Sequence, residues 1–208
     1  LGIGITAPGP LDKDKGIIGE VVNFNGWNNL NIVDAFNNQF ECSVYLDNVS
    51  NALAKAEYLK NPKCQNKYLE LVIDSGFGSA VLLNKEEIEI LECELGHTTV
   101  DMHGKKCECG NVGCAELYVN QTTFFGSRKQ RVDFYSALSS VIVSAINTFN
   151  VRQVVFSGVV VNDFDDFLQN LLGYLQSKTQ NPPDLLASTL ENSKIFTACN
   201  LAIDKYKV

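Results

Sequence analysis

Three cysteines follow a histidine within a short stretch of this 208-residue chain. Cys107, Cys109 and Cys114 stand in the run Cys-Glu-Cys-Gly-Asn-Val-Gly-Cys, and His97 lies shortly before them. Three thiolates and one imidazole satisfy a tetrahedral zinc ion, and the two glycines of the run let the backbone turn tightly enough for the sulfurs to converge. The spacing therefore predicts a structural zinc knuckle with these four ligands, since a closed site leaves no position for a catalytic water.

The alternative is that the three cysteines are unrelated and are either buried or paired in disulfides. No signal peptide or long apolar run is seen in the sequence, so we expect a reduced, cytoplasmic protein. His103 is the rival fourth ligand, but it lies so close before Cys107 that we expect it in an exposed turn. The remaining cysteines have no matching spacing and are expected to be free thiols: Cys42, Cys64, Cys93 and Cys199.

The charge balance argues against nucleic-acid binding by this segment. Lys and Arg number 17 against 24 Asp and Glu, which gives a formal net charge of −7. Nucleic-acid binding is driven largely by Lys and Arg that displace counterions from phosphates. The chain begins at Leu1 inside a strand-like run, so we expect it to be part of a larger protein, with any DNA-binding element before Leu1.

Strand-like and helix-like segments alternate along the chain. Residues 69–73 and 79–83 are expected to pair as a hairpin. Alternation of this kind predicts a mixed α/β protein with largely parallel sheets covered by helices. The expected strands are 1–6, 17–24, 43–46, 69–73, 79–83 and 153–156, and the expected helices are 31–39, 49–58, 134–149, 163–175 and 192–206.

Several motifs along the chain match one known family. By these motifs the chain resembles the ROK family, which groups repressors, uncharacterised reading frames and sugar kinases. The Glu-x-Gly-His segment followed by the cysteine run is the most specific of these motifs. The matching segments are 2–10, Asn25-Gly26-Trp27, 44–48, 74–78, Glu94-Leu95-Gly96-His97, the cysteine run into Glu116, and 155–158.

The resemblance implies an α/β, two-lobed, actin-like ATPase fold of the ribonuclease-H-like class. Residues 1–46 and 192–208 are expected to form the small lobe, and the N-terminal part of that lobe is expected to be missing. Residues 47–191 are expected to form the large lobe, with the zinc knuckle and a homodimer interface that the apolar stretch 141–149 supports.

The resemblance also implies a catalytic base, and here the sequence departs from the family. Family kinases carry Glu-Asn-Asp-x-Asn after a strand, and the aspartate takes the proton from the attacking sugar hydroxyl. The corresponding run is Asp47-Asn48-Val49-Ser50-Asn51, so Val49 stands at the position of the base. Valine cannot accept a proton, and neighbouring Asp47 is expected to point elsewhere. Loss of a positioned base costs about 10²- to 10⁴-fold in rate.

Two more departures lie on the nucleotide side. The family's second phosphate loop reads Gly-Thr-Gly-x-Gly-Gly-Gly, where close backbone approach lets amides hold phosphate. This chain has Asp74 there, and its carboxylate repels phosphate oxygens unless a metal intervenes. The Gly-Gly-Gly that packs on adenine in family kinases appears as Ser157-Gly158-Val159, whose branched side chain is expected to crowd a nucleotide.

The sugar-facing positions are better preserved. The resemblance assigns hydrogen bonds to sugar hydroxyls to Asn48, Glu94, His97 and Glu116. Carboxylates accept from hydroxyls, and a metal-bound imidazole is fixed in one tautomer and orientation. The alternative for Glu94 and Glu116 is an ordinary solvated surface, but their placement around the zinc ligands favours a shaped polar pocket.

These departures favour a non-enzymatic function. The chain is expected to be the sugar-sensing and dimerisation domain of a ROK-type transcriptional regulator, either a repressor or an anti-repressor that acts through protein contacts. The alternative is a diverged ATP-dependent, glucokinase-like sugar kinase. A helix-turn-helix before Leu1 would indicate the regulator, and a phosphate loop there would indicate the kinase. The expected partners are a sugar or sugar derivative, DNA through that upstream segment alone, and a second copy, with no membrane.

Overall fold

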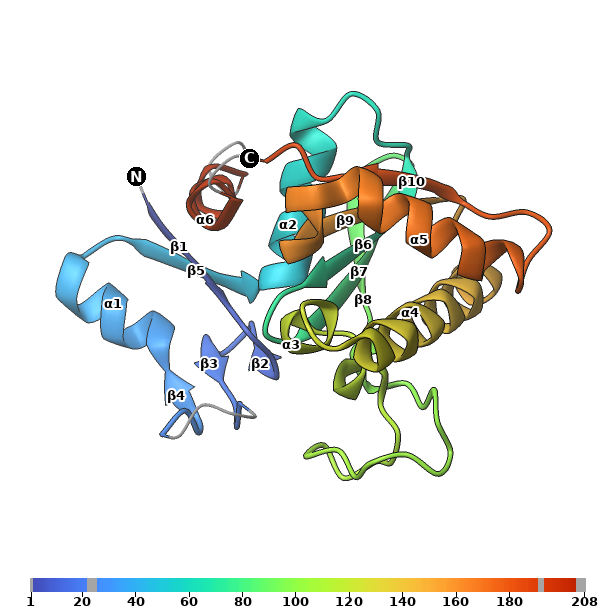
Figure 1. Ribbon diagram of the computed structural model, residues 1–208. Coiled ribbons are helices and arrows are strands. Elements are labelled where there is room, and N and C mark those ends of the chain that lie inside the picture. Colours follow the sequence, from blue (N-terminus) through green and yellow to red (C-terminus); the bar gives the residue numbers. More distant parts are fainter. Residues whose placement is uncertain (1, 22–25, 191–192, 205–208) are drawn as a thin grey trace. The chain divides into compact units, whose positions relative to one another are not determined.

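The computed structural model describes residues 2–21, 26–190 and 193–204 (Figure 1). It divides into two compact units, Leu1–Lys60 with Leu190–Val208 and Asn61–Thr189. The division keeps residues 47–60 with the first unit, whereas the predicted small lobe ends at residue 46. Helix α2 (Val49–Lys60) accounts for the difference, because it packs on helix α6 (Ser193–Asp204). The predicted lobe boundaries stay a prediction.

The first unit is built around two parallel strands. Strand β1 pairs with β5, with Ile3 opposite Val44, and α6 packs against β1. A small core of Ala7, Ile18, Val21 and Leu46 holds the unit together. Besides α2 and α6, the elements of this unit in chain order are β1 (Gly2–Ala7), β2 (Leu11–Asp12), β3 (Ile17–Ile18), β4 (Leu30–Asn31), α1 (Ile32–Phe40) and β5 (Ser43–Asn48).

The predicted strand over 17–24 is too long in its described part, because among residues 17–21 Ile17 and Ile18 alone form a strand. Beyond Ile18 the registers of both ladders continue in single backbone hydrogen bonds: the Gly19 N–H donates to the Pro10 carbonyl oxygen, and the Val21 N–H donates to the Trp27 carbonyl oxygen. The remainder of this prediction, Asn25 of the Asn-Gly-Trp motif, and the predicted ends at residues 1, 192 and 206 lie outside the described residues.

The second unit contains a five-stranded mixed sheet in the order β10-β9-β6-β7-β8. The predicted hairpin is confirmed, since β6 and β7 pair antiparallel from Lys67–Leu83 to Ile73–Phe77. β9 pairs parallel with β6, and β10 pairs parallel with β9. The sequence patterns did not predict the short edge strands β8 and β10. The strands are β6 (Lys67–Ile73), β7 (Phe77–Asn84), β8 (Ile88–Glu92), β9 (Gln153–Gly158) and β10 (Asp184–Ala187).

Two long helices pack together in this unit, α4 (Arg128–Phe149) and α5 (Phe164–Gln176) (Figure 1). Leu69, Leu71 and Ile73 alternate along β6, as residues on one face of a strand do, and they share one buried core with both helices. α4 has the length and mean hydropathy, 1.2, of a membrane-spanning helix, but half of its apolar window is buried inside the unit. This core packing accounts for its apolar face.

The same packing bears on the predicted homodimer interface. Within the stretch 141–149, the side chains of Val141, Ile142, Ala145 and Ile146 are buried in the core of the unit. A side chain that is buried in the core of its own unit cannot contact a partner subunit. These four side chains are therefore not available to a partner, whereas Ser144, Asn147 and Thr148 of the same stretch are exposed. The predicted homodimer interface stays a prediction.

Candidate metal centre and ligand-facing residues

One loop of the second unit brings the four predicted metal ligands together. His97 ends the short 3-10 helix η1 (Leu95–His97), and the three cysteines follow in the loop before the next 3-10 helix, η2 (Ala115–Leu117). The four ligand atoms all lie within 4.8 Å of one another. Nδ1 of His97 is 3.8 Å from the Cys107 Sγ, and the Cys109 Sγ is 3.6 Å from the Cys114 Sγ.

This geometry fits a tetrahedral metal ion. Zinc lies about 2.3 Å from sulfur and about 2.0–2.1 Å from nitrogen, so tetrahedral ligand atoms are about 3.5–3.8 Å apart. Both separations given above fall in that range. Burial, then hydrogen bonds with the Cys109 and Cys107 thiols, raise the pKa of Cys114 to about 12, so its negative form needs a cation beside it. The residues therefore form a cluster that could bind one metal ion, with Nδ1 as the histidine ligand atom.

The backbone of the knuckle is held by a set of local hydrogen bonds. The Cys107 N–H donates to the Asn111 carbonyl oxygen at 2.8 Å, and the Asn111 side-chain amide donates to the His97 carbonyl oxygen at 3.1 Å. Asn111 thus ties the cysteine turn to the histidine, a role that its spacing did not reveal. Outside the cluster, Tyr118 donates its hydroxyl to Asp101 at 3.0 Å, and the rival ligand His103 is exposed.

Two glycines of the knuckle adopt positive φ but differ in their surroundings. Gly110 (φ 94°) has open space where a Cβ would stand, whereas a Cβ on Gly113 (φ 66°) would overlap the Asp101 carbonyl oxygen. We expect Gly110→Ala to cost about 1–2 kcal/mol of unfolding free energy from backbone strain alone. Gly113→Ala is expected to cost roughly 3 kcal/mol or more, since a backbone contact must also move. Denaturant unfolding of both variants checks this, and equal losses would contradict the geometry.

Glu116 lies beside the glycine-containing turn that follows β6. Its Oε2 accepts a hydrogen bond from the Phe77 backbone N–H at 3.1 Å, and a Cβ on Gly76 would lie 3.1 Å from the same oxygen. One carboxylate oxygen of this predicted sugar ligand is therefore already bonded within the protein. The same contact occupies the backbone N–H of Phe77, which lies in the turn aligned above with the family's second phosphate loop. No sequence spacing signals this contact, because it joins residues 39 positions apart.

Glu94 precedes η1 and lies near other charged groups. Although its side chain reaches solvent, partial burial raises the pKa of the Glu94 carboxyl, the His97 charge opposes this, and Glu116 and Glu92 add to the rise. The charges of His97 and Glu116 therefore both act on the Glu94 carboxyl, which places three of the predicted sugar-facing residues near one another. The fourth, Asn48, belongs to the other unit.

At the end of β5 the carboxylate of Asp47 is held by its own surroundings. Its Oδ1 accepts from the Asn48 backbone N–H at 2.7 Å, from the Asn51 side-chain amide at 3.1 Å and from the Lys13 ammonium at 3.2 Å. The Asn48 side chain in turn accepts from the Ser50 N–H at 2.8 Å. Val49, the first residue of α2, carries no group that could take a proton.

The two residues predicted to obstruct a nucleotide occupy different surroundings. Asp74 is half-buried after β6, and its carbonyl oxygen accepts from the Gln121 N–H at 2.7 Å. Val159 opens the 3-10 helix η3 (Val159–Asp163) and packs against the core of the second unit. Gly158 before it has φ 90°, and a Cβ there would overlap the Ile73 carbonyl oxygen.

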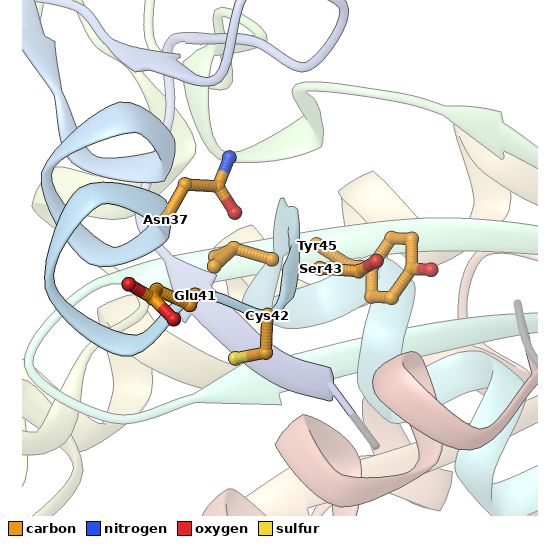
Figure 2. Close-up of a pocket in the computed structure, with 6 residues that line it drawn as sticks. Asn37, Glu41, Cys42, Ser43 and Tyr45 are labelled. Atoms are coloured by element: carbon orange, nitrogen blue, oxygen red, sulfur yellow. The ribbon is translucent and has the colours of Figure 1, made fainter.

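A separate pocket lies in the first unit, where α1 ends and β5 begins (Figure 2). It has a volume of about 520 Å³ and holds none of the predicted site residues. Glu41 ends α1 there in the left-handed conformation, with φ 50°. Its lining residues are Asn37, Glu41, Cys42, Ser43, Val44 and Tyr45.

Two relatives match different shares of the chain. The xylose repressor of Bacillus subtilis (strain 168) is 24% identical over 241 residues, which cover 99% of this chain and 62% of the repressor. The glucokinase of Thermotoga maritima is 28% identical over 124 residues, which cover 58% of this chain and 39% of that enzyme. The matched regions thus span less than two thirds of the length of these relatives.

The fold and the family follow from two further matches. The crystal structure of a ROK hexokinase from Thermus thermophilus matches with a TM-score of 0.74 at 24% identity, covering 98% of this chain and 79% of that one. The chain therefore has the actin-like ATPase fold that the motifs implied. A sequence model of the ROK family matches residues 1–137, well over half of the chain, so this protein belongs to the ROK family.

Proposed function

We propose that this chain is the non-catalytic, sugar-sensing and dimerising domain of a cytoplasmic ROK-type transcriptional regulator, a repressor or an anti-repressor. The observation that carries the proposal is Val49 at the position of the kinase base. Neighbouring Asp47 has one carboxylate oxygen, Oδ1, committed to Lys13, Asn51 and a backbone N–H, which supports a structural role for this residue. The xylose repressor relative supports the regulator class.

The surroundings of the degenerate phosphate loop support the same proposal. The Phe77 N–H is bonded to the Glu116 carboxylate and is not free for a phosphate oxygen. Asp74 adds a second carboxylate to this turn, and two negative groups repel a nucleotide's phosphates. A nucleotide would have to displace an internal hydrogen bond and also meet like charge, so binding of ATP here is expected to be weak.

The metal of the proposed site is zinc, held by His97, Cys107, Cys109 and Cys114. Zinc would fix the imidazole through Nδ1 and leave Nε2 for a ligand hydroxyl. The bound sugar or sugar derivative would also meet Glu94 and the remaining oxygen of Glu116. DNA would be bound only through a segment before Leu1, and the domain would form a homodimer.

Calorimetric titration with xylose, glucose and N-acetylglucosamine tests the sensing function. At least one sugar is expected to bind, and Glu94→Gln should weaken that binding by about 10- to 100-fold, since a hydrogen bond to a charged group is worth about 1.5–3 kcal/mol. Glu89→Gln is the matched control, because Glu89 is an exposed carboxylate on β8. Absence of binding at millimolar sugar, or equal effects of both variants, would count against a sugar sensor.

The second candidate is a diverged ATP-dependent sugar kinase. The glucokinase among the relatives and the hexokinase among the solved structures favour it. It requires a proton acceptor other than Val49, together with a nucleotide site that tolerates Asp74 and the Glu116 contact. Assay of the whole protein for phosphoryl transfer separates the two candidates.

A further inference from the structure

The four ligands of the proposed zinc site differ sharply in their access to solvent. Cys114 is fully buried and Cys107 is 6% exposed, whereas Cys109 lies on the surface of the protein. On Gly110, directly after it, a Cβ would stand in open space. A small solute oxidant can therefore reach the Cys109 sulfur without any movement of the loop.

The exposed sulfur also has a second sulfur within reach. The Cys109 Sγ is 3.6 Å from the Cys114 Sγ, so a disulfide needs a movement of about 1.5 Å to reach the usual bond length of about 2.05 Å. Exposed thiolates next to a second cysteine are the ones that oxidise selectively and reversibly. Zinc coordination keeps a bound thiol deprotonated, which is the nucleophilic form.

We propose that Cys109 is an oxidation site and Cys114 its partner thiol, so that peroxide joins the two in a disulfide and releases the metal. This inference rests on the zinc site proposed above. Cys109 thiolate attacks one peroxide oxygen, the O–O bond breaks, and Cys109 becomes a sulfenic acid while hydroxide leaves. The Cys114 thiolate then attacks the Cys109 sulfur, forming the disulfide and expelling a second hydroxide. Two protons from solvent convert both hydroxides to water.

Release of the metal follows from the loss of two of its four ligands. His97 and Cys107 alone do not make the closed four-ligand site that structural zinc requires. Cys114 also stands directly before η2, and Thr99 pairs with it as an isolated β-bridge. Oxidation thus acts on the segment that carries Glu116, and it would make the proposed sugar site respond to peroxide.

The test begins with the zinc content of the untreated protein, measured by mass spectrometry of metals. Absence of zinc there means that the proposed zinc site is wrong, independently of the oxidation step. Zinc-loaded protein is then exposed to hydrogen peroxide while a metallochromic dye reports released zinc. Retention of zinc by protein whose Cys109 is oxidised would overturn the inference alone.

Mapping of the cysteines identifies the bond. Trypsin cleavage after Lys106 and Arg128 places Cys107, Cys109 and Cys114 in one peptide. Cysteines are alkylated with one reagent before reduction and with a second reagent after it, and fragmentation of this peptide locates each label. We expect Cys109 and Cys114 to carry the second label and Cys107 the first. A bond between Cys107 and either other cysteine, or irreversible oxidation of Cys109 alone, would contradict the proposed pairing.

Two substitutions separate the role of Cys109 from general thiol oxidation. Cys109→Asp keeps a zinc ligand that peroxide does not oxidise, so zinc release should slow by at least about tenfold. Cys199→Ser is the matched control, because Cys199 is the other exposed cysteine and lies on α6 of the first unit. Its release rate should equal that of the wild type. If Cys109→Asp does not hold zinc, the mapping of the wild-type protein decides.

Discussion

Cys114→Ser, or removal of the metal by a chelator, is expected to unfold the segment from Glu94 to Glu116 and to lower the stability of the second unit by several kcal/mol. Structural zinc contributes about 10–16 kcal/mol of binding free energy in small zinc domains, while whole domains are stable by only about 5–15 kcal/mol. The knuckle is anchored in the unit's core through Leu95 and Ala115, so its loss would expose apolar surface.

Circular dichroism during thermal unfolding, with metal content measured on the same samples, checks this expectation. Cys93→Ser is the matched control, because Cys93 is half-buried outside the cluster and a serine hydroxyl can still donate to the Ser79 hydroxyl that now accepts from its thiol. The control should retain zinc and unfold near the wild-type temperature. An unchanged transition after complete removal of zinc would contradict a structural role for the metal.

The whole protein is expected to show no sugar phosphorylation with ATP and magnesium. A missing base costs about 10²- to 10⁴-fold, and kinases turn over at about 1–100 s⁻¹, so loss of the base and of phosphate positioning together should leave no measurable activity. Val49→Asp should not restore turnover, because Glu116 still occupies the Phe77 N–H and Asp74 still repels phosphate.

A coupled assay over hexoses, pentoses and N-acetylated amino sugars provides the measurement. The Thermotoga maritima glucokinase, assayed in parallel, shows that the conditions support phosphorylation of a sugar. Turnover near the kinase range on any sugar would overturn the regulator proposal. Rescue by Val49→Asp alone would instead mean that the nucleotide side is intact and that only the base was lost.

Local sequence patterns predicted the elements whose signal is strong and continuous. The hairpin of β6 and β7, and the long helices α4 and α5, lie where the apolar periodicity placed them, with ends shifted by a few residues. Of the strand predicted over 17–24, Ile17 and Ile18 alone among the described residues form a strand. Beyond them Gly19 and Val21 keep the same registers through single backbone hydrogen bonds, and no apolar pattern signals where a ladder thins in this way. The use of residues 141–149 also depended on tertiary packing, since apolar periodicity is the same for an internal core and for a partner's surface.

The sequence by itself determined the candidate metal ligands, because their spacing lies within one loop and the chemistry of three thiolates and an imidazole is specific. It also determined that Val49 cannot act as a base, which follows from the side chain alone. Only the tertiary structure decided that Asp47 is held by Lys13 and Asn51, and that Glu116 bonds the Phe77 N–H. The contacts with Lys13 and Phe77 join residues 34 and 39 positions apart, and which distant polar groups meet is set by the packing of the sheet and its loops, not by local pattern.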